Sequence, residues 1–179
     1  AALELGERVA VDEIVGIRIE TYPDALKFCD KPQPQTVLEA KFSLQHSVAV
    51  TLLRGGPALA DFEPESVSDP KVRALAAKVD VATGEEFASA YPARYGARVW
   101  VILRDGSEHA GDVPDALGDP ENPVSLDRLK EKALAMCAAG AMSPLMADRL
   151  CHAALDMAEG GPLKSFTTML PALGIRGVV

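Results

Sequence analysis

The chain has 179 residues, of which 48% are hydrophobic and 25% are charged, a composition typical of a globular domain with a substantial core. Its formal net charge of −8 argues against a nucleic-acid or acidic-membrane surface, because phosphate groups attract clusters of Lys and Arg. No run approaches the ~18 to 20 apolar residues that a membrane span needs, and the widely spaced cysteines indicate neither a disulfide framework nor a metal site. We therefore expect a protein of the reducing cytoplasm with no nucleic-acid partner, no membrane partner and no bound metal.

The first expected element is a strand over residues 11–21. Apolar and polar side chains alternate there with a period of two, which is typical of a strand with one covered face. Pro32 and Pro34 then favour an extended or turn backbone, so residues 28–35 are predicted to form a loop that leads into a helix.

Two positions are suitable as the start of that helix. Thr36 and Glu39 have the spacing of a capping box, and Ser43 is a second candidate N-cap. In either case the helix is expected to run to about Arg54, where Gly55 supplies a left-handed cap.

The middle of the chain is expected to complete a small sheet. An N-cap followed by proline predicts a short helix over residues 70–79, and residues 79–81 form a candidate edge strand. Residues 98–104 are apolar on both faces, which predicts a strand that is central in the sheet. Asp105-Gly106 is a strong signal for a two-residue turn, so residues 107–113 are predicted to pair with that strand as a hairpin.

Helices are expected again toward the carboxyl end, one after Ser125 that ends at Gly140 and another after Ser143, followed by a tail that is ambiguous. The predicted fold class is α+β: a small, mainly antiparallel sheet covered by helices, with extra carboxyl-terminal helices. We divide the chain into an α+β domain over residues 1–140 and carboxyl-terminal helices over residues 141–179.

Other motifs give weaker signals. The acidic run at residues 61–65 resembles a calcium loop only in charge, because it lacks that loop's spacing and glycine, and we interpret it as a solvated connection. Gly55-Gly56-Pro57 follows a helix rather than preceding one, so it does not indicate a phosphate-binding loop.

Polar side chains gather among apolar residues where the helix begins, at Lys41, Ser43, Gln45 and His46. On a continuous helix the step from Lys41 to His46 rotates ~140° about the axis, which would aim the two side chains apart. We prefer a helix that begins at Ser43, with its hydroxyl capping the amide of His46, because Lys41 then lies outside that helix and can turn toward the same pocket. A helix N-terminus beside an ammonium group suits a carboxylate substrate. The alternative is that Lys41 is a solvated helix residue and that His46 is partly buried and hydrogen-bonded to the backbone.

Four segments, Lys27-Phe28-Cys29-Asp30, Pro34-Gln35-Thr36, Lys41-Phe42-Ser43-Leu44 and Leu53-Arg54-Gly55, resemble the carboxyl-terminal part of the MmgE/PrpD family. This family includes 2-methylcitrate dehydratase-like and cis-aconitate decarboxylase-like enzymes. The resemblance implies that Lys41 and His46 are catalytic, and we expect Lys41, Ser43 and Gln45 to bind substrate. The histidine matches the decarboxylase branch, whereas many relatives carry a tyrosine at that place.

The resemblance further implies an enzyme that acts on a small di- or tricarboxylate by proton transfer next to a carboxylate, in a dehydration, decarboxylation or epimerisation. It implies no metal or organic cofactor, a homodimer, and an amino-terminal helical domain of the same protein on which residues 141–179 would pack. Because the chain opens without methionine, we expect a fragment that is inactive by itself. The alternative is a non-catalytic domain that dimerises or assembles with a separate helical subunit.

Overall fold

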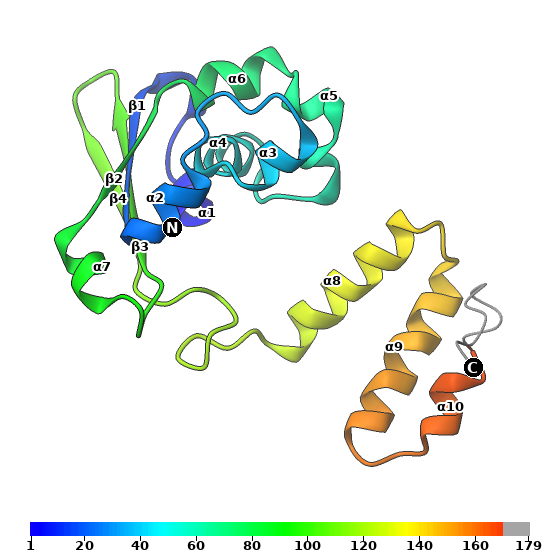
Figure 1. Cartoon of the computed structure of the whole chain (residues 1–179). Coiled ribbons are helices and arrows are strands. Elements are labelled where there is room, and N and C mark those ends of the chain that lie inside the picture. Colours follow the sequence, from blue (N-terminus) through cyan, green and yellow to red (C-terminus); the bar gives the residue numbers. More distant parts are fainter. Residues whose placement is uncertain (170–179) are drawn as a thin grey trace. The chain divides into compact units, whose positions relative to one another are not determined.

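A four-stranded sheet forms the centre of the first of two units, Ala1–Asn122 and the residues from Pro123 onward. The computed structural model describes residues 1–169 of the chain (Figure 1). The strands, in chain order, are β1 (Ile14–Thr21), β2 (Val79–Thr83), β3 (Ala97–Leu103) and β4 (Glu108–Val113). Their spatial order is β2-β1-β3-β4, with β1 parallel to β2 and the other two pairings antiparallel. The α+β class is confirmed, with a sheet that is mixed rather than purely antiparallel.

Short helices occupy the connections of this unit. They are α1 (Ala2–Gly6), α2 (Pro23–Cys29), α3 (Val37–Lys41), α4 (Leu44–Arg54), α5 (Pro64–Val67), α6 (Pro70–Ala76) and α7 (Glu85–Ala90), with single 3-10 turns η1 (Val11–Glu13) and η2 (Leu59–Phe62). The parallel neighbours β1 and β2 require a long crossover, because two parallel strands cannot be joined by a tight turn. Helices α2 to α6 fill that crossover and bring the residues of the candidate site together on one side of the sheet (Figure 1).

One face of the sheet and the helices α1, α4 and α6 enclose the core. Ile17 and Ile19 of β1 and Val101 of β3 belong to the same cluster of buried apolar side chains as residues of α4, which include Val50 at 0% exposure. Helix α4 packs against both α1 and α6, so it is buried along most of its length. This burial fixes α4 in place and with it the polar residues at its start.

Strand β3 is central in the sheet, as predicted, because it pairs with both β1 and β4, but its apolar residues on the face away from the core are only partly buried. Trp100 and Ile102 of β3 are only half-buried. The guanidinium carbon of Arg18 lies 4.1 Å from the centre of the Trp100 ring, so an arginine covers this aromatic face. An apolar pattern shows that side chains avoid water, but it does not show which neighbour shields them.

Several boundaries also differ from the predicted ones. The strand expected at residues 11–21 begins at Ile14 after a 3-10 turn and ends at Thr21 as predicted, and helix α2 opens two residues later at Pro23. Proline at the first position of a helix is favourable because that position donates no helical hydrogen bond. The edge strand expected at residues 79–81 is confirmed as β2, and the Asp105-Gly106 hairpin is confirmed between β3 and β4.

The second unit consists of helices. Helix α8 (Leu126–Ala139) is capped by Ser125 and α9 (Pro144–Ala158) by Ser143, as the sequence predicted, and α10 (Leu163–Thr167) packs on α9. The compact units separate at Asn122, whereas the boundary expected at residue 140 falls in the turn between α8 and α9. The part of the ambiguous tail from residue 170 lies outside the described residues. Within residues 1–169 no helix combines the length and the apolar character needed to cross a membrane.

We expect Val101→Ala to lower the free energy of unfolding by about 2 kcal/mol or more, because it removes buried methyl groups and leaves a cavity in the core. Val15→Ala on the neighbouring strand is the matched control, since Val15 is 50% exposed and Val101 is 0% exposed. The control should change stability by no more than about 0.5 kcal/mol. Urea unfolding of both variants measures the difference, and equal effects would contradict the assigned faces of the sheet.

Candidate functional site

The chain changes direction between α3 and α4, at the polar residues that the sequence singled out. The capping box at the start of α3 is confirmed: Thr36 Oγ1 accepts a hydrogen bond from the Glu39 amide at 3.1 Å, and the Glu39 carboxylate accepts one from the Thr36 amide at 3.2 Å. The Glu39 carboxylate also accepts from the Gln35 amide, which is the main reason why its pKa lies below the usual value. Helix α3 ends at Lys41.

A second helix start at Ser43 is confirmed as well. Ser43 Oγ accepts a hydrogen bond from the His46 amide at 3.0 Å, so α4 begins immediately after Ser43. Lys41 is therefore outside α4, and the two residues do not sit on one continuous helix. This helix start is the one that the sequence favoured.

Ser43 and Gln45 hold the preceding loop against α4. Ser43 Oγ donates to the Lys31 carbonyl at 2.7 Å, Gln45 Nε2 donates to the Asp30 carboxylate at 2.6 Å, and the Lys31 amide donates to Gln45 Oε1 at 3.2 Å. Both side chains are almost fully buried, Ser43 at 2% and Gln45 at 1% exposure. Their polar atoms thus position the loop, and contact of either residue with a substrate stays a prediction.

His46 is buried, and one of its ring nitrogens has a backbone partner. His46 Nε2 lies 2.7 Å from the Asp61 carbonyl oxygen, and the residue is 2% exposed. A carbonyl oxygen only accepts hydrogen bonds, so Nε2 carries a proton and, in the neutral ring, Nδ1 is the nitrogen with a free lone pair. The backbone bond is the one that the alternative interpretation expected of His46. It also leaves Nδ1 able to accept a proton.

The loop that holds His46 is itself held by Arg54 at the far end of α4. Arg54 donates to the Asp61 carboxylate, to Ser66 Oγ at 2.9 Å and to the Asp69 carboxylate at 2.8 Å. The hydrogen bond with Asp61 is the main reason why the pKa of Arg54 is raised. Asp61 is only 4% exposed, so the interpretation of residues 61–65 as a solvated connection is wrong at its first residue.

A cavity of about 150 Å³ adjoins His46. The loop Pro32, Gln33, Pro34 and Gln35 forms one wall, and Val67 with the α6 residues Val72, Arg73, Ala76 and Ala77 forms another. Arg73 was not predicted as a site residue, because a single arginine on the polar side of an amphipathic helix gives no local signal of a site. The cavity combines a basic imidazole, a guanidinium group and amide side chains.

Lys41 does not line this cavity. It is exposed at the end of α3, next to Phe42 at 49% exposure and near Leu38 at 66% exposure. The described residues therefore bring Ser43, Gln45 and His46 together but leave Lys41 on the adjoining surface.

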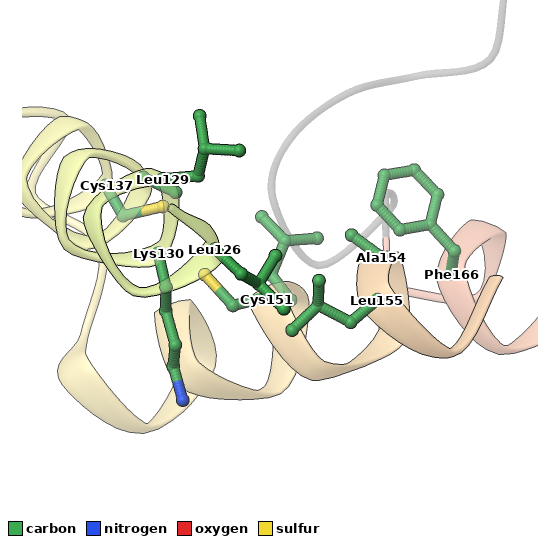
Figure 2. A pocket seen from close by; sticks show the side chains of 10 residues that line it. Leu126, Leu129, Lys130, Cys137, Cys151, Ala154, Leu155 and Phe166 are labelled. Atoms are coloured by element: carbon green, nitrogen blue, oxygen red, sulfur yellow. The ribbon is translucent and has the colours of Figure 1, made fainter. Parts of the chain in front are cut away.

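The second unit contains a larger hollow of about 330 Å³, which differs in chemistry (Figure 2). Aliphatic side chains and two cysteine sulfurs from α8 and α9 line it together with Phe166 of α10, and Lys130 supplies the charged side chain among the lining residues. A polar ligand needs several convergent hydrogen-bonding groups, so this hollow does not suit a di- or tricarboxylate.

The first unit is thus an α+β domain that holds a histidine beside a cavity at a capped helix start, as expected of a domain that contributes to an active site. The family model of the MmgE/PrpD C-terminal domain matches residues 1–157, and the chain belongs to this family. Over 101 residues it is 31% identical to the mitochondrial 2-methylcitrate dehydratase of Yarrowia lipolytica. That match covers 54% of this chain but only 19% of the length of the relative.

Ser43→Ala should lower the free energy of unfolding by about 1 to 2 kcal/mol, because it removes the cap of α4 and the hydrogen bond to the Lys31 carbonyl. Ser89→Ala, at an exposed position of α7, is the control and should be close to neutral. Chemical unfolding measures both. A neutral effect of Ser43→Ala would show that the cap does not hold the site.

Stability should also depend on pH through Asp69, the N-cap of α6. The Lys71 amide, and after it Arg54, holds the pKa of the Asp69 carboxyl below its usual value of 3.8. A lowered pKa in the folded state stabilises the protein fully above the unfolded value, and the contribution is lost as pH falls through the folded value. The stability difference between the wild-type chain and Asp69→Asn should therefore be constant near neutral pH and shrink in strong acid, as measured by urea unfolding at a series of pH values. A difference that persists at the lowest pH would contradict this assignment.

Proposed function

We propose that this chain is the carboxyl-terminal domain of an enzyme that acts on a small di- or tricarboxylate by moving a proton at a carbon next to a carboxylate. The relative whose name is 2-methylcitrate dehydratase supports dehydration as the first candidate reaction. Decarboxylation and epimerisation require the same first event, which is the development of negative charge beside a carboxylate. The proposal therefore includes them as alternative reactions.

One observation carries the proposal: His46 lines the cavity with one ring nitrogen fixed by the Asp61 carbonyl. A fixed Nε2–H leaves Nδ1 as the basic atom and prevents the ring from turning. Imidazole is the side-chain group that most often transfers protons in active sites, so an oriented histidine ring suits general acid–base catalysis. We assign His46 the role of proton acceptor or donor.

Lys41 is assigned the role of electrostatic stabiliser. Lys41 is the last residue of α3, and a substrate carboxylate bound by its ammonium group at this junction would also meet the N-terminus of α4. Exposed apolar side chains lie close to it in the chain, with Leu38 at 66% and Phe42 at 49% exposure. Such a surface suits a protein partner that covers it and excludes water. A cation stabilises developing negative charge more strongly in a site from which water is excluded.

We propose that the partner is an amino-terminal helical domain of the same protein, which completes the site. The match to only 19% of the length of the relative supports this assignment. Further acid, base and binding groups would then come from that domain, so residues 1–179 alone would have little or no activity. The proposal includes a homodimer and no metal or organic cofactor. It also includes a reducing compartment, for which we propose the cytoplasm, whereas the relative from Yarrowia lipolytica is named a mitochondrial enzyme.

A second candidate function is a non-catalytic domain that dimerises or assembles with a separate helical subunit. Exposed apolar residues along α8 favour it, with Leu126 at 56%, Leu129 at 49% and Met136 at 42% exposure. The complete reading frame discriminates between the two functions. A helical segment encoded upstream favours the enzyme, and a start near Ala1 favours the assembly domain.

We expect Lys41→Ala to lower kcat/KM about 10²- to 10³-fold and His46→Gln to lower kcat about 10²- to 10⁴-fold in the protein encoded by the complete reading frame. Glutamine at position 46 keeps an N–H that can donate to the Asp61 carbonyl but removes the basic nitrogen. The assay follows the unsaturated product of 2-methylcitrate dehydration by ultraviolet absorbance, and the release of CO2 from cis-aconitate.

Lys71→Ala is the matched control, because Lys71 is an exposed lysine at the start of α6 and does not line the cavity. All variants should keep the wild-type melting temperature within a few degrees. Near-normal turnover of Lys41→Ala or His46→Gln would remove that residue from the mechanism, and the absence of turnover in the wild-type protein with all such acids would favour the assembly domain.

A further inference from the structure

The side chain of Arg73 on helix α6 is held by a hydrogen bond and lies beside a cavity. A position on a surface helix requires neither feature. Arg73 Nε donates to the Val67 carbonyl at 3.0 Å, so the guanidinium plane is held at one edge. The side chain also lines the cavity beside His46. The two terminal nitrogens have no protein hydrogen-bond acceptor within the part of the chain that the structure describes.

Arg73 further differs from several other arginines of the first unit. Arg54, Arg94 and Arg98 each pair with an aspartate, whereas none of the described carboxylates forms a salt bridge with Arg73. In a chain with 26 acidic and 18 basic side chains, an arginine without a carboxylate beside a cavity has an unmatched positive charge. Arginine presents its N–H groups in a planar fork that matches the two oxygens of a carboxylate.

The rest of the cavity is compatible with an organic anion. The Gln33 and Gln35 side chains supply amide groups at the loop wall, and Val72, Ala76 and Ala77 supply an apolar wall for a short carbon chain. The volume of about 150 Å³ is below the ~300 Å³ at which ligand pockets usually begin. It therefore suits one carboxylate arm of a ligand rather than the whole of a larger molecule.

We infer that Arg73 is a substrate-binding residue that anchors one carboxylate of the acid in the cavity beside His46. This inference rests on the proposed function, since it assigns that same site its recognition group. Arg73 would hold a non-reacting carboxylate while the carbon that loses the proton faces His46. It would thus select acids with at least two carboxylates over monocarboxylates.

The first test measures binding alone, with the 179-residue chain and citrate as the probe. Arg73→Gln should weaken citrate binding about tenfold or more, as expected for loss of a charge-assisted hydrogen bond, and the Arg73 Nε–H signal of the wild-type chain should shift in a nitrogen-edited NMR titration. Lys71→Gln removes the same charge from the same helix and is the control, which should bind citrate within about twofold of the wild type. Equal weakening in both variants, or no citrate-dependent shift in the wild-type chain, would overturn the inference.

The second test separates recognition from structure in the protein encoded by the complete reading frame. Arg73→Gln should raise KM about tenfold or more with little change in kcat, because the anchored carboxylate is held equally in the ground state and the transition state. Arg73→Lys, which keeps the charge but not the fork, should give an intermediate KM. If only the fold depended on Arg73, melting temperature would fall and KM would not follow this order, which would overturn the inference.

The two tests also distinguish this inference from the proposed function. Citrate binding that depends on Arg73, in a complete protein that turns over none of the candidate acids, would support the inference as an anion site and reject the catalytic proposal. Turnover that depends on Lys41 and His46 with an unchanged KM in Arg73→Gln would support the catalytic proposal and reject Arg73 as the anchor.

Discussion

The hydrogen bond from the His46 amide to Ser43 Oγ at 3.0 Å is the interaction on which the candidate site depends. It ends the run of α3 and opens α4, so that the chain turns at residues 42 and 43 instead of continuing as one helix. The same oxygen donates to the Lys31 carbonyl, which ties the proline-containing loop to the new helix. One buried hydroxyl therefore places both the histidine and the wall of the cavity that it faces.

The sheet makes this arrangement rigid. Helix α4 is buried between α1, α6 and the inner face of the strands, so its N-terminus cannot shift without disturbing the core. Close packing transmits such displacements because protein interiors contain few voids. The buried side chains of Gln45 and His46 at the start of α4 each have a hydrogen-bond partner, which is the condition under which buried polar residues are tolerated.

The local features of this site were predictable from sequence, and the tertiary ones were not. The Thr36 box and the Ser43 cap follow from residues three positions apart, and both are confirmed. The Asp61 carbonyl beside His46 comes from a loop 15 residues away in the chain, and its burial depends on Arg54, so no local pattern could show it. Arg73 likewise becomes part of a cavity only after α6 packs against α4. Strand direction was also hidden, since alternation of side chains is the same in a parallel and an antiparallel β2.

The position of Arg54 limits the insertions and deletions that helix α4 can tolerate. His46 lies in the first turn of α4 and Arg54 is its last residue, and both reach the same short segment around Asp61. Insertion or deletion of one residue between them would rotate one end about 100° relative to the other and shift it by about 1.5 Å. Both attachments could not survive that change. Sequence length should therefore stay constant within residues 43–54.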